Sequence, residues 1–328
     1  MDATAAPLLQ VRGLKTWFHT FGGVVKAVDG VSFELNEGEI VGLVGESGGG
    51  KSMVGFSIMG LIDKPGRIEA GEILFEGRDL ARLKEDELRR VRGSRVAMIF
   101  QDPMTALNPL YTIGDQLEEM LKLHTDLTAE ERRARCVKML ADVGIPQPEA
   151  RLNSYPHQFS GGMRQRVVIA IAMIAGPRLL IADEPTTALD VTIQAQLLRL
   201  MKQQVEQART ALILITHDLA AVSQMADRIV VLYCGRVVET GQAAELIAAP
   251  RHPYTRGLLD SIPANHQDRK RLPQIPGSVP DIRRLPPGCS FAPRCPRAQE
   301  LCRQTAPELQ AEPSGHAASC HFPLEGRA

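Results

Sequence analysis

Residues 39–52 read EIVGLVGESGGGKS, a short apolar run followed at once by a glycine-rich loop. The run Glu39–Val44 is typical of a buried strand, and the loop Gly45–Ser52 matches the pattern G-x-x-x-x-G-K-[ST]. In that pattern backbone N–H groups surround phosphate oxygens, the lysine reaches the β and γ phosphates, and the hydroxyl holds Mg²⁺. A helix expected from about Met53 adds its positive N-terminus. The predicted nucleotide contacts are Gly45, Glu46, Ser47, Gly48, Gly49, Gly50, Lys51, Ser52 and Met53.

The sequence on both sides of this loop predicts the rest of an α/β fold. Residues 8–35 alternate apolar and polar side chains around Gly22-Gly23, which predicts an antiparallel strand pair. Residues 104–168 are charged and helical in period, which predicts an inserted helical subdomain. The apolar runs Leu179–Ala182 and Ala211–Thr216 are typical of a parallel sheet covered on both faces.

Two acids follow the strand predicted at Leu179–Ala182. Asp183 is placed near the metal, and Glu184 lies one residue further on, near an attacking water. Many strands end in an acidic turn, so this pair is weak evidence alone. Together with the Lys51 loop it predicts the second half of a phosphate-hydrolysing site.

Composition limits the class of protein. The chain has 328 residues, 44% of them hydrophobic, and 38 basic side chains balance 38 acidic ones, so no excess of positive charge indicates nucleic-acid binding. Its apolar runs are shorter than the roughly 18 residues that indicate a membrane span. The first residues show no basic region followed by an apolar one, so we expect a cytosolic protein with reduced thiols.

A third motif carries a resemblance to a known family. The segment Phe159–Met163 reads FSGGM and resembles the LSGGQ signature of ABC ATPases, with Phe for Leu and Met for Gln. In that family the signature loop covers ATP bound to the opposite subunit. The resemblance implies that Ser160, Gly161, Gly162 and Met163 contact a γ-phosphate in trans.

The same resemblance assigns further residues. It implies that Gln101 senses Mg²⁺ and the attacking water while touching the membrane partner, that Asp190 communicates across the dimer, and that His217 contacts the γ-phosphate. Phe18 is the best match for the aromatic ring that stacks on adenine, with Trp17 and Phe21 as rivals. The implied catalytic residues are Glu184, Lys51, His217 and Gln101, and the implied Mg²⁺ ligands are Ser52, Gln101 and Asp183.

Longer segments resemble one group within the family. They are residues 101–109 (QDPMTALNP), 187–196 (TALDVTIQAQ) and 252–259 (HPYTRGLL), and they are similar to the ATPases of dipeptide, oligopeptide and nickel importers. The resemblance implies two transmembrane permease subunits, a second ATPase that is identical or different, and an extracytoplasmic receptor reached indirectly. It places the chain peripherally at the cytoplasmic face of the inner membrane.

Alternatives to peptide import remain at this point. The same motor could serve nickel or another small solute. A soluble ABC ATPase without a transport role is the alternative of a different class. Only 58 residues separate Gln101 from Ser160, which leaves no room for the long coiled coil of ABC-type DNA-repair ATPases.

The end of the chain differs in composition. We divide the chain into an ATPase domain over residues 1–260 and a proline-rich segment over residues 261–328, which should hold little regular structure. That segment contains Cys289, Cys295, Cys302 and Cys320. In a cytosolic protein four such thiols favour a metal over disulfides.

The family resemblance implies that a four-iron four-sulfur cluster binds these cysteines, and zinc or no metal are the alternatives. His316 and His321 are spare ligands that we expect to be solvated surface residues.

Overall fold

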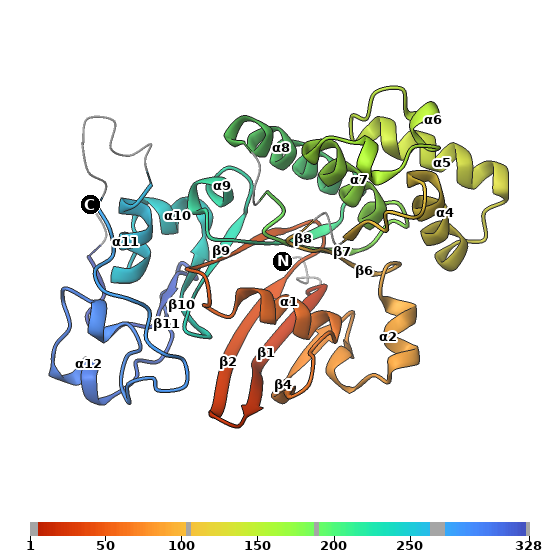
Figure 1. The fold of residues 1–328 in the computed structure, drawn as a ribbon. Coiled ribbons are helices and arrows are strands. Elements are labelled where there is room, and N and C mark those ends of the chain that lie inside the picture. Colours follow the sequence, from red (N-terminus) through yellow and green to blue (C-terminus); the bar gives the residue numbers. More distant parts are fainter. Residues whose placement is uncertain (1–5, 103–105, 187–189, 263–272, 326–328) are drawn as a thin grey trace. The chain divides into compact units, whose positions relative to one another are not determined.

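The computed structural model describes residues 6–102, 106–186, 190–262 and 273–325. The chain forms two compact units. The first contains residues 1–36, 40–82 and 214–328, and the second contains residues 37–39 and 83–213. Each unit is described separately below (Figure 1).

An antiparallel sheet begins the first unit. Its strand order is β2-β1-β4-β5. The strands are β1 (Leu9–Thr20), β2 (Gly23–Leu35), β4 (Gly66–Phe75) and β5 (Arg78–Asp79). Leu9 pairs with Leu35 and Thr20 with Gly23, so the predicted antiparallel pair is confirmed. Helix α1 (Lys51–Met59) is joined to β1 by a buried hydrogen bond of 2.7 Å between the Thr16 and Ser57 hydroxyls.

A second set of strands in the first unit has the order β11-β12-β10-β9-β3. The strands are β3 (Ile40–Val44), β9 (Arg228–Tyr233), β10 (Arg236–Gln242), β11 (Gln310–Ala311) and β12 (Ala317–Ala318). Strand β3 is buried at every residue and pairs in parallel with β9. The helices of this unit after α1 are α9 (Leu219–Ser223), α10 (Ala243–Ala248), α11 (Pro253–Asp260) and α12 (Glu300–Gln304).

The second unit joins a short parallel sheet to the helical subdomain. Strands β6 (Val96–Ile99) and β7 (Leu179–Asp183) pair in parallel, and both are fully buried. Strand β8 (Ala211–Thr216) lies next to β7 and runs across the division of the chain after residue 213. The apolar runs predicted at Leu179–Ala182 and Ala211–Thr216 are thus confirmed as buried strands.

Helices α4 to α7 gather in one part of the second unit (Figure 1). The α-helices among the described residues of this unit are α2 (Glu85–Val91), α4 (Ile113–His124), α5 (Ala129–Asp142), α6 (Pro148–Arg151), α7 (Gly161–Met173) and α8 (Val191–Ala208). Thr112 and Thr128 form capping boxes with Asp115 and Glu131, which fixes where α4 and α5 begin. The predicted α/β fold with an inserted helical subdomain is confirmed, although α7 continues to Met173.

The described part of the C-terminal segment contains little regular structure, as its prolines predict. Its short strand β12 nevertheless pairs with β10, where Ala317 lies opposite Thr240. The predicted boundary near residue 260 stays a prediction.

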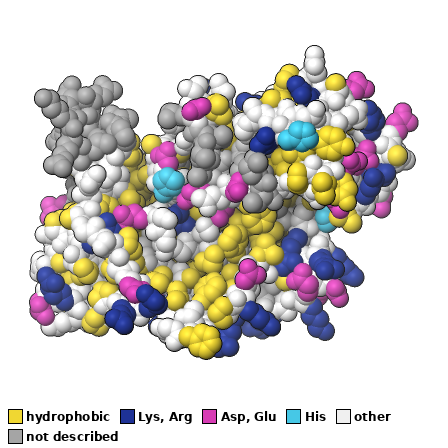
Figure 2. Space-filling view, viewed as in Figure 1, with side chains coloured by type: hydrophobic (Ala, Val, Ile, Leu, Met, Phe, Trp, Pro, Cys, Tyr) yellow, Lys and Arg dark blue, Asp and Glu magenta, His cyan; other side chains and the backbone are white. Residues whose placement is uncertain are grey.

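Surface side chains of both charge signs lie among hydrophobic ones on the face shown in Figure 2. Among the helices that the structure describes, none combines the length and the apolar character needed to cross a membrane.

Candidate nucleotide-binding site

The glycine-rich loop connects β3 to α1, and two of its glycines cannot be replaced without strain. Gly45 has a φ of 153°, and a Cβ there would lie 2.2 Å from the Leu232 carbonyl oxygen. Gly50 has a φ of 93°, and a Cβ there would lie 2.1 Å from the Ala27 carbonyl oxygen. Gly50 is also the N-cap of α1, so the helix begins at Lys51 and not at the expected Met53. The loop therefore ends at a helix N-terminus, the arrangement that binds phosphate.

Lys51 is the buried cation of this loop. Its residue exposure is 5%, and its Nζ donates to the carbonyl oxygens of Gly45 at 2.9 Å and Glu46 at 3.0 Å. The ammonium group is thus held across the loop, where it can bind phosphate oxygens.

Glu46 also contacts residues far along the chain. Its backbone N–H donates to the Tyr254 hydroxyl at 2.7 Å, and its carboxylate forms an ion pair with Arg294. The sequence pattern did not indicate these contacts, because 208 and 248 residues separate the partners. Three arginines, at positions 294, 297 and 303, lie among the cysteines of this segment, and nothing in the sequence distinguishes Arg294 from the other two.

The second unit brings together two of the predicted catalytic residues. Glu184 follows β7, and its Oε2 accepts a hydrogen bond of 3.2 Å from Gln101 Nε2. Asp183 is the last residue of β7 and is 3% exposed. Glu184 has a φ of 46°, an uncommon conformation for a residue with a side chain, which turns the chain sharply after Asp183.

The FSGGM segment starts helix α7. Ser160 is the N-cap, and its hydroxyl accepts a hydrogen bond of 3.4 Å from the backbone N–H of Met163. Gly161, Gly162 and Met163 form the first helical turn, which begins two residues earlier than the expected start near Met163. The N-terminus of this 13-residue helix can attract a phosphate group.

The remaining predicted residues lie at the ends of elements. Asp190 is the exposed N-cap of α8, and His217 is exposed directly after β8. Thr187, Ala188 and Leu189 of the motif before Asp190, and Pro103, Met104 and Thr105 after Gln101, lie outside the described residues.

The three candidate adenine-stacking rings have different surroundings. The Phe18 ring lies against Gly66, where an added Cβ would come within 2.5 Å of it. The Trp17 ring is covered by Lys26, whose Nζ is 4.7 Å from the ring centroid, and Phe21 is fully exposed.

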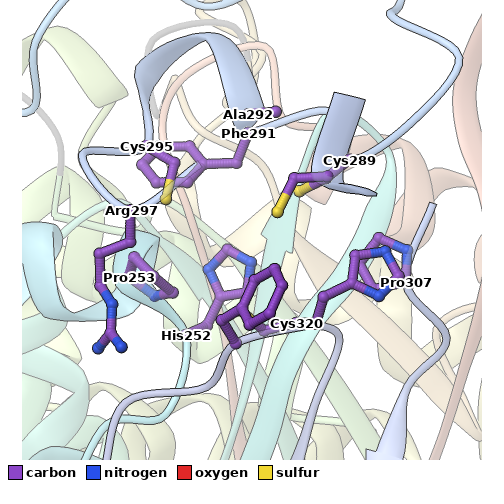
Figure 3. Close-up of a pocket in the computed structure, with 12 residues that line it drawn as sticks. His252, Pro253, Cys289, Phe291, Ala292, Cys295, Arg297, Pro307 and Cys320 are labelled. Atoms are coloured by element: carbon purple, nitrogen blue, oxygen red, sulfur yellow. The ribbon is translucent and has the colours of Figure 1, made fainter. Parts of the chain in front are cut away.

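The four C-terminal cysteines line one small cavity together with His252 and Phe291. All four are free, and the Cys289 and Cys295 sulfur atoms point into the cavity (Figure 3). Backbone N–H groups of Phe291 and Ala292 reach the Cys289 thiol, and those of Arg297 and Phe322 reach Cys295 and Cys320. Such N–H groups stabilise thiolates.

Burial nevertheless raises the pKa of Cys289 and Cys295, and it raises the pKa of Cys320 to about 11. As protonated thiols these cysteines would have to lose protons to bind a metal. Among the described residues, no group of three or more His, Cys, Asp or Glu side chains is arranged to hold a metal ion.

Two histidines of this part of the chain, His252 and His316, are buried, whereas His321, which lines the cavity, is partly exposed. His316 is 2% exposed, so the expectation that it is a solvated surface residue was wrong. Its Nε2 lies 2.7 Å from Oε1 of the fully buried Glu239, and this hydrogen bond raises the pKa of His316. His252 is in the opposite situation, because its burial lowers its pKa to about 4 and its Nδ1 accepts from the Tyr254 N–H at 3.0 Å.

Two family models match the sequence. Residues 28–187 match the ABC transporter model, and residues 238–302 match the model of the C-terminal region of oligopeptide/dipeptide transporters. The dipeptide transport ATP-binding protein DppD of Escherichia coli is 51% identical over 318 residues, which are 97% of this chain and 97% of that protein. The chain belongs to the ABC transporter family.

Other relatives of this ABC ATPase are similar over nearly their full lengths. The oligopeptide transport ATP-binding protein AppD of Bacillus subtilis is 51% identical, with 95% of this chain and 96% of that protein covered. OppD of Escherichia coli is 46% identical, with 98% and 95% covered.

A dimeric bacterial ABC transporter cassette, MJ0796, superposes with a TM-score of 0.64 at 28% identity, covering 72% of this chain and 98% of that chain. The same cassette is known in a post-hydrolysis state bound to ADP and phosphate, with the same score. As a member of this family, the ABC ATPase described here hydrolyses ATP.

Proposed function

We propose that this chain is the ATP-hydrolysing subunit of an importer of dipeptides or oligopeptides. One observation carries the proposal: the similarity to ATP-binding proteins of peptide transporters covers nearly the whole chain and includes the separate C-terminal region. A cassette shared by all ABC ATPases would not by itself favour peptides. The C-terminal region favours peptides, because it matches the family model of the C-terminal region of oligopeptide/dipeptide transporters.

The glycine-rich loop would bind the triphosphate. Backbone N–H groups of the loop surround the β and γ phosphates, and Lys51 neutralises charge that develops as the terminal phosphoryl group is transferred. Ser52, Gln101 and Asp183 would hold Mg²⁺, since a hydroxyl, an amide oxygen and a carboxylate are the oxygen ligands that this ion prefers. His217 would contact the γ-phosphate, and Phe18 would stack on adenine.

Glu184 would polarise the attacking water. Its carboxylate is already hydrogen-bonded to Gln101, so the amide holds the carboxylate in one orientation. The water that it polarises would attack the γ-phosphate in line with the departing ADP oxygen.

The signature residues would act on a second subunit. Ser160, Gly161, Gly162 and Met163 form a helix N-terminus that suits a phosphate brought by a partner. Asp190, at the start of α8, would communicate across the dimer. The partner ATPase is either a second copy or a related chain, and two permease subunits and an extracytoplasmic receptor complete the importer, which places the chain at the cytoplasmic face of the inner membrane.

The four cysteines would hold a four-iron four-sulfur cluster. Three of their thiols receive backbone N–H groups, as cluster-binding cysteines do. Zinc is the alternative, because four cysteine thiolates are also a ligand set of structural zinc sites. When bound, the group would crosslink a segment too rich in proline to form a core of its own.

Uptake by whole cells tests the choice of solute. We expect cells that express this chain with its permeases, partner ATPase and receptor to accumulate a labelled dipeptide such as Ala-Ala. Unlabelled peptides should compete for this uptake, whereas nickel should not.

Accumulation of labelled nickel without peptide uptake would favour the nickel alternative. No uptake of any solute, with normal ATP hydrolysis, would favour a non-transport ABC ATPase.

A further inference from the structure

Glu46 is the second residue of the phosphate-binding loop. Its backbone N–H, its carbonyl oxygen and its carboxylate each have a partner. Its backbone N–H donates to Tyr254 of α11, and its carbonyl oxygen accepts from Lys51 Nζ at 3.0 Å. The same carbonyl oxygen accepts from the Gly49 N–H at 3.1 Å. The carboxylate is bound by Arg294. Two of these partners belong to the C-terminal part of the chain.

Arg294 is fixed in a geometry suited to one carboxylate. Its Nη1 is 2.5 Å from Glu46 Oε2 and its Nη2 is 3.0 Å from Oε1, a bidentate pair. Its Nε donates to the Pro276 carbonyl oxygen at 3.0 Å, and its side chain is only 4% exposed. A lysine could not make these contacts at once, because the planar fork of arginine is needed.

Aromatic rings support both partners of Glu46. The ring centroids of Tyr233 and Tyr254 are 4.7 Å apart, and Phe291 lies 5.3 Å from the first and 5.4 Å from the second. The Tyr233 hydroxyl accepts from Arg294 Nη1 at 3.4 Å. Packed rings hold the hydroxyl of Tyr254 and the guanidinium of Arg294 in place.

The charge of Glu46 explains why this support matters. A carboxylate in a loop that binds a triphosphate repels the ligand unless a cation offsets it. Arg294 supplies that cation from outside the loop through the Glu46 carboxylate, while the Tyr254 hydroxyl holds the Glu46 backbone N–H. Because Arg294 directly precedes Cys295, the fold around the cysteine cavity also determines where the guanidinium lies.

We infer that Arg294 is a positioning residue for ATP binding, through which the C-terminal segment holds the phosphate-binding loop and neutralises Glu46. The inference rests on the proposed role of this loop in binding ATP. If Arg294 has this role, the affinity for ATP depends on the proline-rich segment over residues 261–328.

Titration of the purified full-length chain with a fluorescent ATP analogue and Mg²⁺ tests this. We expect Arg294→Ala to raise Kd about tenfold, equivalent to about 1.4 kcal/mol. The double variant Arg294→Ala/Glu46→Gln should return to within about threefold of the parent chain, because it leaves no uncompensated carboxylate. Arg283→Ala is the control, since this exposed C-terminal arginine pairs with Asp281 and not with the loop.

A weaker affinity for ATP must be distinguished from a loss of stability. Thermal unfolding of each variant shows whether it is folded at the temperature of the titration. If Arg294→Ala folds too poorly to measure, Tyr254→Phe replaces it, with Kd raised about threefold by loss of one hydrogen bond to the loop.

An unchanged Kd in the folded single variants would overturn the inference, as would a double variant that binds no better than Arg294→Ala. If the parent chain itself failed to bind the analogue, the proposed role of the loop would fail instead.

Discussion

Replacing Glu184 with Gln leaves ATP binding intact and slows hydrolysis by about 10²- to 10³-fold, which adds about 3 to 4 kcal/mol to the barrier. The reason is the loss of the carboxylate that polarises the attacking water, while Lys51 and the loop that bind the phosphates are unchanged. Gln has the same shape, so the sharp turn at φ 46° is kept. The measurement is the rate of phosphate release by the assembled transporter, with ATP binding measured in parallel.

Glu206→Gln serves as the matched control for this substitution. Glu206 is an exposed residue of α8 that lies near Lys202, so this variant should hydrolyse ATP at the parent rate. Near-normal turnover in Glu184→Gln would remove Glu184 from the catalytic role. Loss of ATP binding in that variant would show instead that Glu184 supports the site as a whole.

Replacing Cys289 and Cys320 together with Ser is expected to abolish metal binding. The parent chain, purified without oxygen, should be brown and contain about four iron and four sulfide per chain, because four thiolates complete the ligand set of such a cluster. With two ligands lost, iron and colour should be absent. Thermal unfolding should also occur at a lower temperature, because the crosslink of the proline-rich segment is gone.

Cys136→Ala is the control for the cysteine substitutions. Cys136 is buried in α5 of the second unit, and its burial raises its pKa to about 11, as expected of an inert thiol. This variant should keep all of its iron. A colourless parent chain with about one zinc would contradict the cluster and favour the zinc alternative, and a parent chain without metal would contradict both.

The elements nearest the sequence motifs could be predicted because local patterns determine them. Strands β7 and β8 are short apolar runs, and both lie within a residue of the predicted ends. Helix α7 begins after Ser160 because the Ser160 side chain caps it, which is a local effect. Its observed first residue is Gly161, whereas the expected one was near Met163. Helix α1 begins before Met53 because Gly50 takes a left-handed conformation that ends the loop there.

Contacts between distant segments could not be predicted in this way. The pairing of Arg294 with Glu46 depends on the fold of the C-terminal segment, and no periodic pattern records it. His316 was misassigned because a histidine near prolines and polar residues gives no sign of burial. Its burial beside Glu239 follows from the pairing of β12 with β10, and a strand of two residues has too weak a pattern to detect.

The most direct measurement is ATP hydrolysis by the transporter reconstituted in vesicles from this chain, its partner ATPase and its two permeases. With the receptor present, the rate should be low without peptide and should rise severalfold when a dipeptide is added, because the peptide-loaded receptor would bring the two ATPases together around ATP. An equal rate with and without peptide, in vesicles that bind the loaded receptor, would contradict the conclusion that this ABC ATPase drives peptide import.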